Sequence, residues 1–132
     1  MKVRSSFNTL FLVITFLSCS KGDDTPQPTI QEKIIGKWFI ESYVGYSDEC
    51  LKQSYINFVN DKQAVSEWKN YDSNNNCVSY FGESLVFYSL TGNEDIVFDG
   101  GDTWHIISVS NTQLKVSSQM ENDGTLIFVK SN

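Results

Sequence analysis

The stretch IIGKWFIESY, residues 34–43, marks the point where a helical pattern changes into a strand pattern. Just before it, Thr29 and Glu32 have the spacing of a capping box, which predicts a single helical turn. Gly36 is a suitable end for that turn, because glycine adopts the backbone conformations that follow helices. From Trp38 onward, aromatic and β-branched residues predict a strand. The stretch therefore predicts a short helix that leads directly into a first β-strand.

Seven further segments are short and rich in β-branched or aromatic residues. They are SYINFV (54–59), QAVSEWKNY (63–71), CVSYFGESLVFYSL (77–90), EDIVF (94–98), TWHIISVS (103–110), QLKVSS (113–118) and TLIFVK (125–130). We expect Gly82 to bend or divide the longest segment. Turn sequences rich in Asn, Asp and Gly separate them, which predicts antiparallel neighbours. The predicted fold class is all-β, a small antiparallel eight-stranded up-and-down barrel preceded by a short helical turn.

The N-terminal segment has the layout of a secretory signal. Lys2 and Arg4 form a positive region, Leu10 to Leu17 form an apolar region, and Ser18 is a small residue before Cys19. The apolar run is shorter than the roughly 20 residues that a membrane span needs. The sequence FLSC resembles the lipobox of bacterial lipoproteins. This resemblance implies that residues 1–18 are a lipoprotein signal peptide and that Cys19 carries a lipid anchor, whereas the alternative is an ordinary signal peptide with an incidental Cys19.

Residues 19–29 contain acids and prolines, which predicts a polar, lipid-anchored linker without a fold of its own. Its start, CSKGDD, resembles that of lipoproteins in Bacteroidetes-type bacteria, where such a start directs the anchored protein to the cell surface. The predicted location is therefore the outer membrane, at the cell surface, with the lipid on Cys19 as the membrane contact. The formal net charge of −6 disfavours nucleic acid and anionic lipid head groups as partners.

Two cysteines remain, Cys50 and Cys77, in a chain predicted to be exported and therefore open to disulfide formation. A bond between them would close a loop of about 28 residues and stabilise the fold by about 3.6 kcal/mol in the chain-entropy description. The alternative is two free thiols or a thiolate nucleophile. Neither cysteine has a neighbouring His, Lys pair or C-x-x-C spacing that would lower its pKa.

The helical turn followed by Gly36 and Trp38 is similar to the opening of lipocalins. With the export signal and the cysteine pair, residues 30–132 resemble the lipocalin-like domains of Bacteroidetes-type surface lipoproteins. This resemblance implies that Gly36 permits the turn into the first strand and that Trp38 closes one end of the barrel. Lipocalins usually place an Arg from a late strand over this Trp, and here Lys130 is the residue available for that place.

One candidate metal site is a partial calcium loop. Asp72, Asn74, Asn76 and Glu83 fall on positions 1, 3, 5 and 12 of an EF-hand loop. Cys77 occupies the turn position that requires Gly, and both flanks have strand patterns. We therefore interpret the segment as an Asn-rich hairpin turn that leads into a strand, and we predict no metal site here.

Other polar residues suggest no chemistry that can be assigned. Four acids are expected near one rim of the barrel, where they serve solubility, with a weak calcium site as the alternative: Glu94, Asp95, Asp99 and Asp102. His105 lies alone in a strand pattern, and no G-x-S-x-G motif accompanies it, so we expect a hydrogen-bonding surface residue. Glu67 and Glu83 are carboxylates that could face inward, but nothing selects them as a catalytic pair. The sequence predicts no enzyme and no cofactor.

Two functions stay open. Six Phe, six Tyr and three Trp remain after residue 18, which suggests a binding module whose open end admits a small apolar ligand. The alternative is a structural or protein-interaction module whose interior is filled by the same rings. An apolar cavity of about 300 Å³ or more in the barrel interior would favour the ligand-binding alternative.

Overall fold

Eight antiparallel strands close into a barrel in the computed structural model, which describes residues 26–132. Around the barrel they are β1 (Gly36–Tyr43), β10 (Gly124–Lys130), β9 (Gln113–Ser118), β8 (Thr103–Val109), β7 (Asp95–Phe98), β6 (Ser84–Thr91), β3 (Gln63–Glu67) and β2 (Tyr55–Phe58). The predicted fold class is thus confirmed. The predicted signal peptide, Cys19 and most of the linker lie outside the described residues.

The short helix α1 (Ile30–Ile34) begins at the predicted capping box. The backbone N–H of Thr29 donates to Glu32 Oε2 at 2.7 Å, and the backbone N–H of Glu32 donates to Thr29 Oγ1 at 3.2 Å. These bonds satisfy amide groups that the first turn of a helix leaves without partners.

Among the helices of residues 26–132, none has the length and apolar character that a membrane-spanning helix needs.

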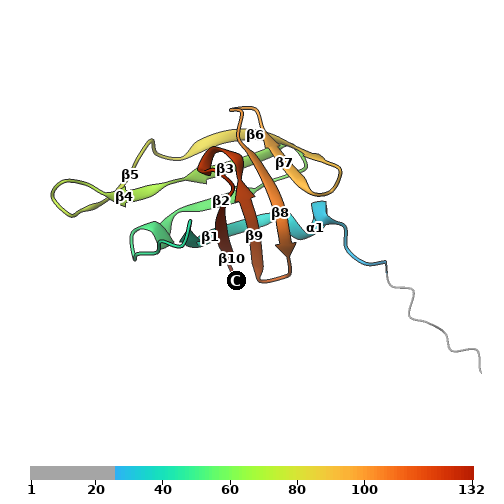
Figure 1. Cartoon of the computed structure of the whole chain (residues 1–132), viewed down its shortest axis with the longest axis horizontal. Helices are drawn as coiled ribbons and strands as arrows, with labels where there is room; N and C mark the ends of the chain where they lie inside the picture. Colours follow the sequence, from blue (N-terminus) through green and yellow to red (C-terminus); the bar gives the residue numbers. More distant parts are fainter. Residues whose placement is uncertain (1–25) are drawn as a thin grey trace, which may run out of the picture.

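A two-stranded hairpin of β4 (Lys69–Tyr71) and β5 (Cys77–Ser79) lies outside the barrel (Figure 1). The single strand predicted for residues 63–71 is therefore wrong, because the chain leaves the barrel at Trp68. The segment 77–90 divides around Gly82 as expected. Gly82 has φ +72°, a left-handed conformation that glycine adopts with little strain, and its N–H donates to Ser79 Oγ at 3.0 Å.

The strand register separates two ends of the barrel. Gly36 pairs with Phe58 at the end that carries α1, which we call the closed end. Tyr43 pairs with Leu126 at the other end, which we call the open end. The open end carries the loops 44–54 and 99–102, the short 3₁₀ helix Gln119–Glu121 and the β4–β5 hairpin. Figure 1 shows α1 and this hairpin on opposite sides of the molecule.

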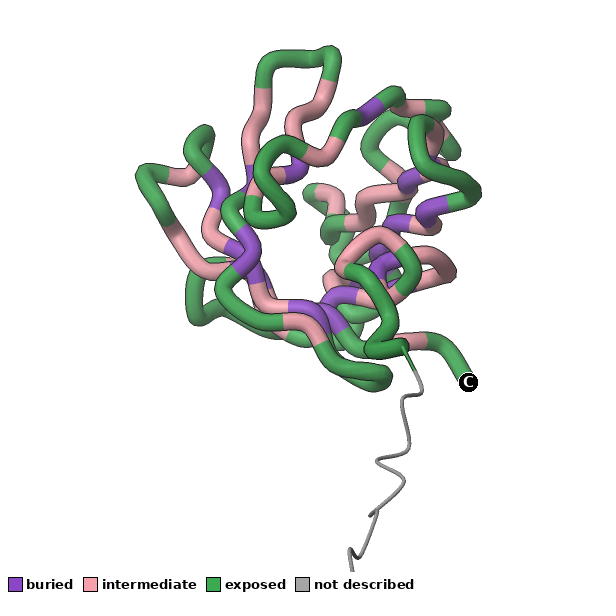
Figure 2. The backbone as a smooth tube through the Cα atoms, turned by 90° about the vertical axis from the view of Figure 1, so that its right-hand side faces the viewer, coloured by how far each residue is buried: buried purple, intermediate pink, exposed green. Residues whose placement is uncertain are grey.

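The core lies inside the barrel because inward and outward residues alternate along the strands. In β2, Ile56 and Phe58 are buried in the core, and in β10 Leu126 and Phe128 are buried in the same way. Buried segments accordingly alternate with more exposed ones along the tube in Figure 2. Burial of each such side chain contributes about 1.5–3 kcal/mol to folding.

The structure contains the predicted disulfide between Cys50 and Cys77, whose Cα atoms are 5.4 Å apart. Cys50 is fully buried beside the short 3₁₀ helix Leu51–Gln53, and Cys77 begins β5. The bond therefore ties the loop after β1 to the external hairpin. It constrains the open end of the barrel.

Candidate functional site

Three residues fill the closed end, and we call Gly36, Trp38 and Lys130 the closing cluster. Trp38 is fully buried, and its Nε1 donates to the carbonyl oxygen of Ile34 at 2.6 Å. Lys130 is the cross-strand partner of Trp38, and its Nζ lies 4.8 Å from the centre of the indole ring. The same Nζ donates to the carbonyl oxygen of Lys33 at 3.2 Å. Lys130 thus occupies the place that the sequence comparison with lipocalins assigned to it.

Gly36 has φ +118°, a conformation that residues with a side chain rarely adopt. A Cβ atom at this position would lie 3.0 Å from Lys130 Cε, which is closer than ordinary van der Waals contact. The glycine therefore allows both the turn from α1 into β1 and the position of Lys130 over Trp38. The closing cluster is packed, with the ring of Trp38 fully buried.

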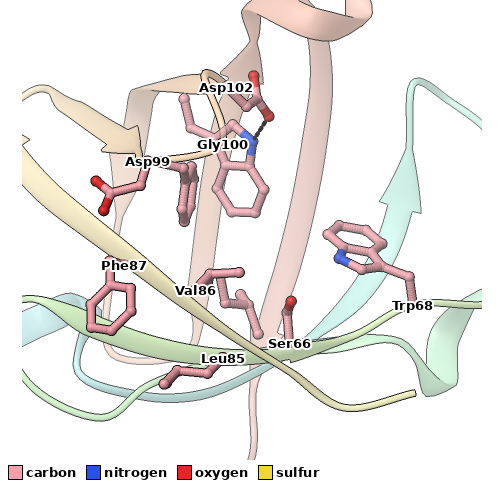
Figure 3. Close-up of a pocket in the computed structure, with 11 residues that line it drawn as sticks. Ser66, Trp68, Leu85, Val86, Phe87, Asp99, Gly100 and Asp102 are labelled. Carbon is pink, nitrogen blue, oxygen red and sulfur yellow. Dashed lines mark hydrogen bonds between the residues drawn. The ribbon is translucent and has the colours of Figure 1, made fainter. Parts of the chain in front are cut away.

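The open end contains a cavity of about 400 Å³, which we call the open-end cavity. Its apolar walls include Ile56 and Val86 from the barrel and the rings of Trp68, Phe98 and Trp104. Figure 3 shows Trp68 on one side of this space, with Asp99 and Phe87 on the other. The cavity is large enough to fall within the usual range for small-molecule sites, about 300–1,000 Å³.

The aromatic wall is held in place by packing and by one hydrogen bond. The ring centres of Phe98 and Trp104 are 4.8 Å apart in an edge-to-face arrangement, and Trp104 also packs on Phe128 at 5.3 Å. Trp104 Nε1 donates to Asp102 Oδ2 at 2.6 Å (Figure 3). Because the indole has both apolar contacts and a polar partner, its orientation is fixed.

Trp68 is half-buried where the chain leaves the barrel, with its ring centre 6.4 Å from that of Tyr43. Besides the open-end cavity, it lines two smaller cavities of about 130 and 270 Å³. Burial is the main reason that the pKa of Tyr43 is raised, and the neighbouring carboxylate of Glu121 adds to this effect. Because Trp68 lines all three cavities, it is the wall that they share at the open end.

The mouth of the open-end cavity lies where the sheet pairing is incomplete. Ser66 pairs with Ser84 between β3 and β6, but pairing between β6 and β7 begins only at Tyr88 and Phe98. Residues 84–87 therefore have a strand on one side and the loop 99–102 on the other. Leu85 lines the cavity in this segment and is 58% exposed. The gap in pairing creates an opening in the barrel wall.

The charged residues that line the cavity are both acidic. Asp102 is half-buried, and it accepts hydrogen bonds from Trp104 Nε1, from Ser118 Oγ at 3.1 Å and from the backbone N–H of Met120 at 3.3 Å. Asp99 is exposed at the mouth. No Lys, Arg or His is among the residues that line this cavity. The arrangement combines an apolar interior with negative charge at its edge.

The partial calcium loop forms a hairpin turn. Asp72 Oδ1 accepts from the backbone N–H groups of Asn74 and Asn76 at 2.9 and 2.8 Å, and these hydrogen bonds lower the pKa of Asp72. Glu83 accepts a hydrogen bond from the hydroxyl of Tyr55 instead of joining Asp72. The interpretation as an Asn-rich turn is confirmed for the β4–β5 hairpin.

The expectation that four acids lie near one rim is wrong. Glu94 and Asp95 lie at the closed end of β7, whereas Asp99 and Asp102 lie beyond its other end. The reason is that β7 runs from the closed end of the barrel toward the open end, so the two pairs lie at its opposite ends.

Within residues 26–132, no group of three His, Cys, Asp or Glu residues has an arrangement that could hold a metal ion. His105 is exposed with Nδ1 2.8 Å from Asp95 Oδ1, as expected for a hydrogen-bonding surface residue.

No sequence motif marks Trp68 or Trp104 as a residue of the candidate site. Both tryptophans lie where a strand meets an open-end loop, and Trp104 follows the glycine-rich turn DGGDT. An aromatic residue at the loop end of a barrel strand is the signal that would have suggested a cavity wall. This signal can be interpreted only when it is known which end of the barrel is closed.

Comparison with known proteins defines the class. A family model described as "Lipocalin-like domain" matches residues 34–116, and the chain belongs to this family. A lipocalin-like fold is generally a binding fold and not an enzyme. The chain is similar to the crystal structure of a lipocalin-like protein from Bacteroides uniformis ATCC 8492, with 19% identity and a TM-score of 0.51. The match covers 75% of this chain and 99% of that one, and it shows the shared fold. No curated protein matches the sequence.

Proposed function

We propose that this protein binds a small apolar ligand in the open-end cavity. The observation that carries the proposal is the cavity itself, with a volume of about 400 Å³ inside a barrel of the lipocalin-like family. Trp68, Phe98 and Trp104 line it, and aromatic side chains supply large contact areas to apolar ligands.

The rigidity of the wall supports binding. Trp104 is 4% exposed and is held by Asp102 and by the rings on either side. A side chain that is already fixed loses little conformational entropy when a ligand binds, and preorganisation of this kind increases affinity.

A protein-interaction module is the second candidate function. Tyr80 and Phe81, which follow β5, are 66% and 84% exposed, and their ring centres are 5.1 Å apart. Such exposed rings are common in protein interfaces. The cavity favours the ligand, because the interior is filled at the closed end and hollow at the open end.

The proposed function is binding without chemistry and without a cofactor. The titratable residues that line the open-end cavity are Asp99 and Asp102, and neither Cys nor His is among its lining residues. Asp102 accepts three neutral donors, which suits a structural and recognition role.

Binding is tested by titrating residues 26–132 with the neutral apolar dye N-phenylnaphthylamine and following its fluorescence. We expect saturable binding to one site.

Two matched variants test whether the dye binds in the cavity. Ser66→Leu fills the cavity from β3 and should weaken binding about tenfold or more. Ser89→Leu adds the same side chain on the exposed face of β6 and should leave binding unchanged. Equal affinities in the two variants, or no saturable binding, would contradict the proposal. Native mass spectrometry of protein from its own host would show whether a small molecule copurifies.

The proposed location is the outer membrane at the cell surface, through lipid on Cys19. The hydrophobic segment before Cys19 and the polar linker after it support this proposal. The change Cys19→Ala should release the protein into the soluble fraction. Retention of the variant in membranes after salt and carbonate washes would contradict the lipid anchor.

A further inference from the structure

We propose that the ligand of the open-end cavity is an apolar molecule with a cationic head group, such as a protonated or quaternary amine. This inference rests on the proposed function, because it names the ligand class for the same cavity. It is carried by the charges and the aromatic faces that surround the cavity.

The negative charge at the cavity has no cationic partner in the described part of the chain. Asp99 and Asp102 line the open-end cavity, and Glu121 lines the adjoining one together with Asp102. The ion pairs within residues 26–132 are Lys52 with Glu49 and His105 with Asp95, so neither cavity aspartate belongs to one. The carboxylates are therefore available to attract a positive charge.

Asp102 is positioned for this role by neutral groups. Its oxygens accept from Trp104 Nε1 at 2.6 Å, from Ser118 Oγ at 3.1 Å and from the backbone N–H of Met120 at 3.3 Å. These bonds orient the carboxylate, but each donor is uncharged, and the negative charge remains. A half-buried carboxylate gains most from a partner of opposite charge, because water screens it less than an exposed one.

The aromatic walls favour a cation for a second reason. The faces of Trp and Phe rings carry negative charge density and attract ammonium groups. At the closed end, the ring of Trp38 already has such a partner in Lys130. In the described residues, the other rings with a lysine over them are Phe39 and Tyr55. The cavity rings Trp68 and Trp104 have no lysine partner of this kind, so a ligand could supply the cation.

The same features disfavour an anionic ligand such as a fatty acid. A carboxylate head would need Lys or Arg at the cavity, and neither lines it. It would also lie close to Asp99 and Asp102, whose charge would repel it. The charge of the ligand head is therefore the property that distinguishes ligands with similar apolar chains.

The test uses three probes with the same alkyl chain: octyltrimethylammonium, octanol and octanoate. Each competes with N-phenylnaphthylamine at low ionic strength and below its micelle-forming concentration. We expect octyltrimethylammonium to bind about tenfold more tightly than octanol, and octanoate to bind most weakly. Added salt should reduce the preference for the cation, because it screens charges at the mouth.

Matched variants show which carboxylates cause the preference for the cationic probe. Asp99 makes no side-chain hydrogen bond to the described residues, so Asp99→Asn removes charge without disturbing contacts. Both this change and Asp102→Asn should lower the ratio of octyltrimethylammonium affinity to octanol affinity about threefold. Asp61→Asn removes the same charge from the exposed turn between β2 and β3 at the closed end, and it should leave the preference unchanged.

The outcomes separate the two proposals. Equal competition by all three probes, or tightest binding of octanoate, would overturn the inference about charge while binding of a small apolar ligand stands. An unchanged preference in both Asp99→Asn and Asp102→Asn would also overturn it. If neither the dye nor any probe binds saturably, the proposed function fails together with the inference.

Discussion

The two ends of this barrel use tryptophan in different ways. At the closed end, Trp38 is fully buried, bonded to the backbone and covered by Lys130. At the open end, Trp68 and Trp104 face a cavity of about 400 Å³. A packed ring contributes its contacts to stability, whereas the half-buried ring of Trp68 keeps part of its surface free. The comparison shows that the barrel is packed around a tryptophan at one end and has a cavity at the other, as the proposed function requires.

The disulfide lies on the side where packing is incomplete. Cys50 and Cys77 join the loop after β1 to the β4–β5 hairpin, close to the open end. A covalent bond lowers the entropy of the unfolded chain without filling the interior. It therefore stabilises the fold while leaving the cavity free.

The sharpest test of the comparison pairs two tryptophan substitutions. Trp38→Ala should lower the free energy of unfolding by about 3–5 kcal/mol, because it leaves a cavity in the closing cluster. Trp68→Ala should cost about 1–2 kcal/mol, since the ring is half-buried, but it should weaken dye binding. Urea unfolding and dye titration measure the two effects. Equal losses of stability in the two variants would remove the distinction between the ends.

Reduction of the disulfide should have the next largest effect. We expect the free energy of unfolding to fall by about 2–4 kcal/mol when Cys50 and Cys77 are reduced. The measurement is urea unfolding with and without dithiothreitol. The double variant Cys50→Ala/Cys77→Ala serves as the control, because dithiothreitol should not change its stability. A wild-type protein that is insensitive to the reductant would contradict a stabilising disulfide.

Glycine substitutions should also destabilise the protein more at the closed end than at the open end. Gly36→Ala should cost about 1–3 kcal/mol, because φ is +118° and the new Cβ would lie 3.0 Å from Lys130 Cε. Gly100→Ala at the open end should change stability by less than about 0.5 kcal/mol, since nothing lies within 4 Å of its Cβ position. Thermal and urea unfolding compare them. A larger loss for Gly100→Ala would show that the open-end loop is the more constrained one.

The smallest expected effect is alkaline destabilisation through Tyr55. Burial, followed by the hydrogen bond and charge of Glu83, raises the pKa of Tyr55 to about 12. Because the folded pKa exceeds the unfolded value of about 10, the contribution is complete below pH 10 and is lost between about pH 10 and 12. At pH 11 we expect a loss of about 1 kcal/mol relative to pH 9. Tyr55→Phe should show a smaller loss over the same interval, and an equal loss would assign the effect to other tyrosines.

Much of the fold could be predicted because the relevant signals are local. The capping box at Thr29 and Glu32, the turn at Gly36 and the alternation in β10 depend on neighbouring residues. The bond between Cys50 and Cys77 could be predicted because few cysteines leave few pairings. The division at Trp68 could not be predicted, since residues 63–71 have a continuous strand pattern. Only pairing partners distant in sequence separate β3 from β4.

The candidate site depended on tertiary structure for a different physical reason. Composition shows that aromatic side chains are abundant, but the same rings could fill a barrel or line a cavity. Their roles follow from where each strand begins and ends around the closed sheet, which places Trp38 in the closing cluster and Trp104 at the open-end cavity. The same geometry moves Asp95 away from Asp102, although they are close in sequence. The local sequence pattern specifies a strand and the face of it that points inward. The position of a residue along the barrel axis is set by strand register, and register arises from contacts between segments that are distant in sequence.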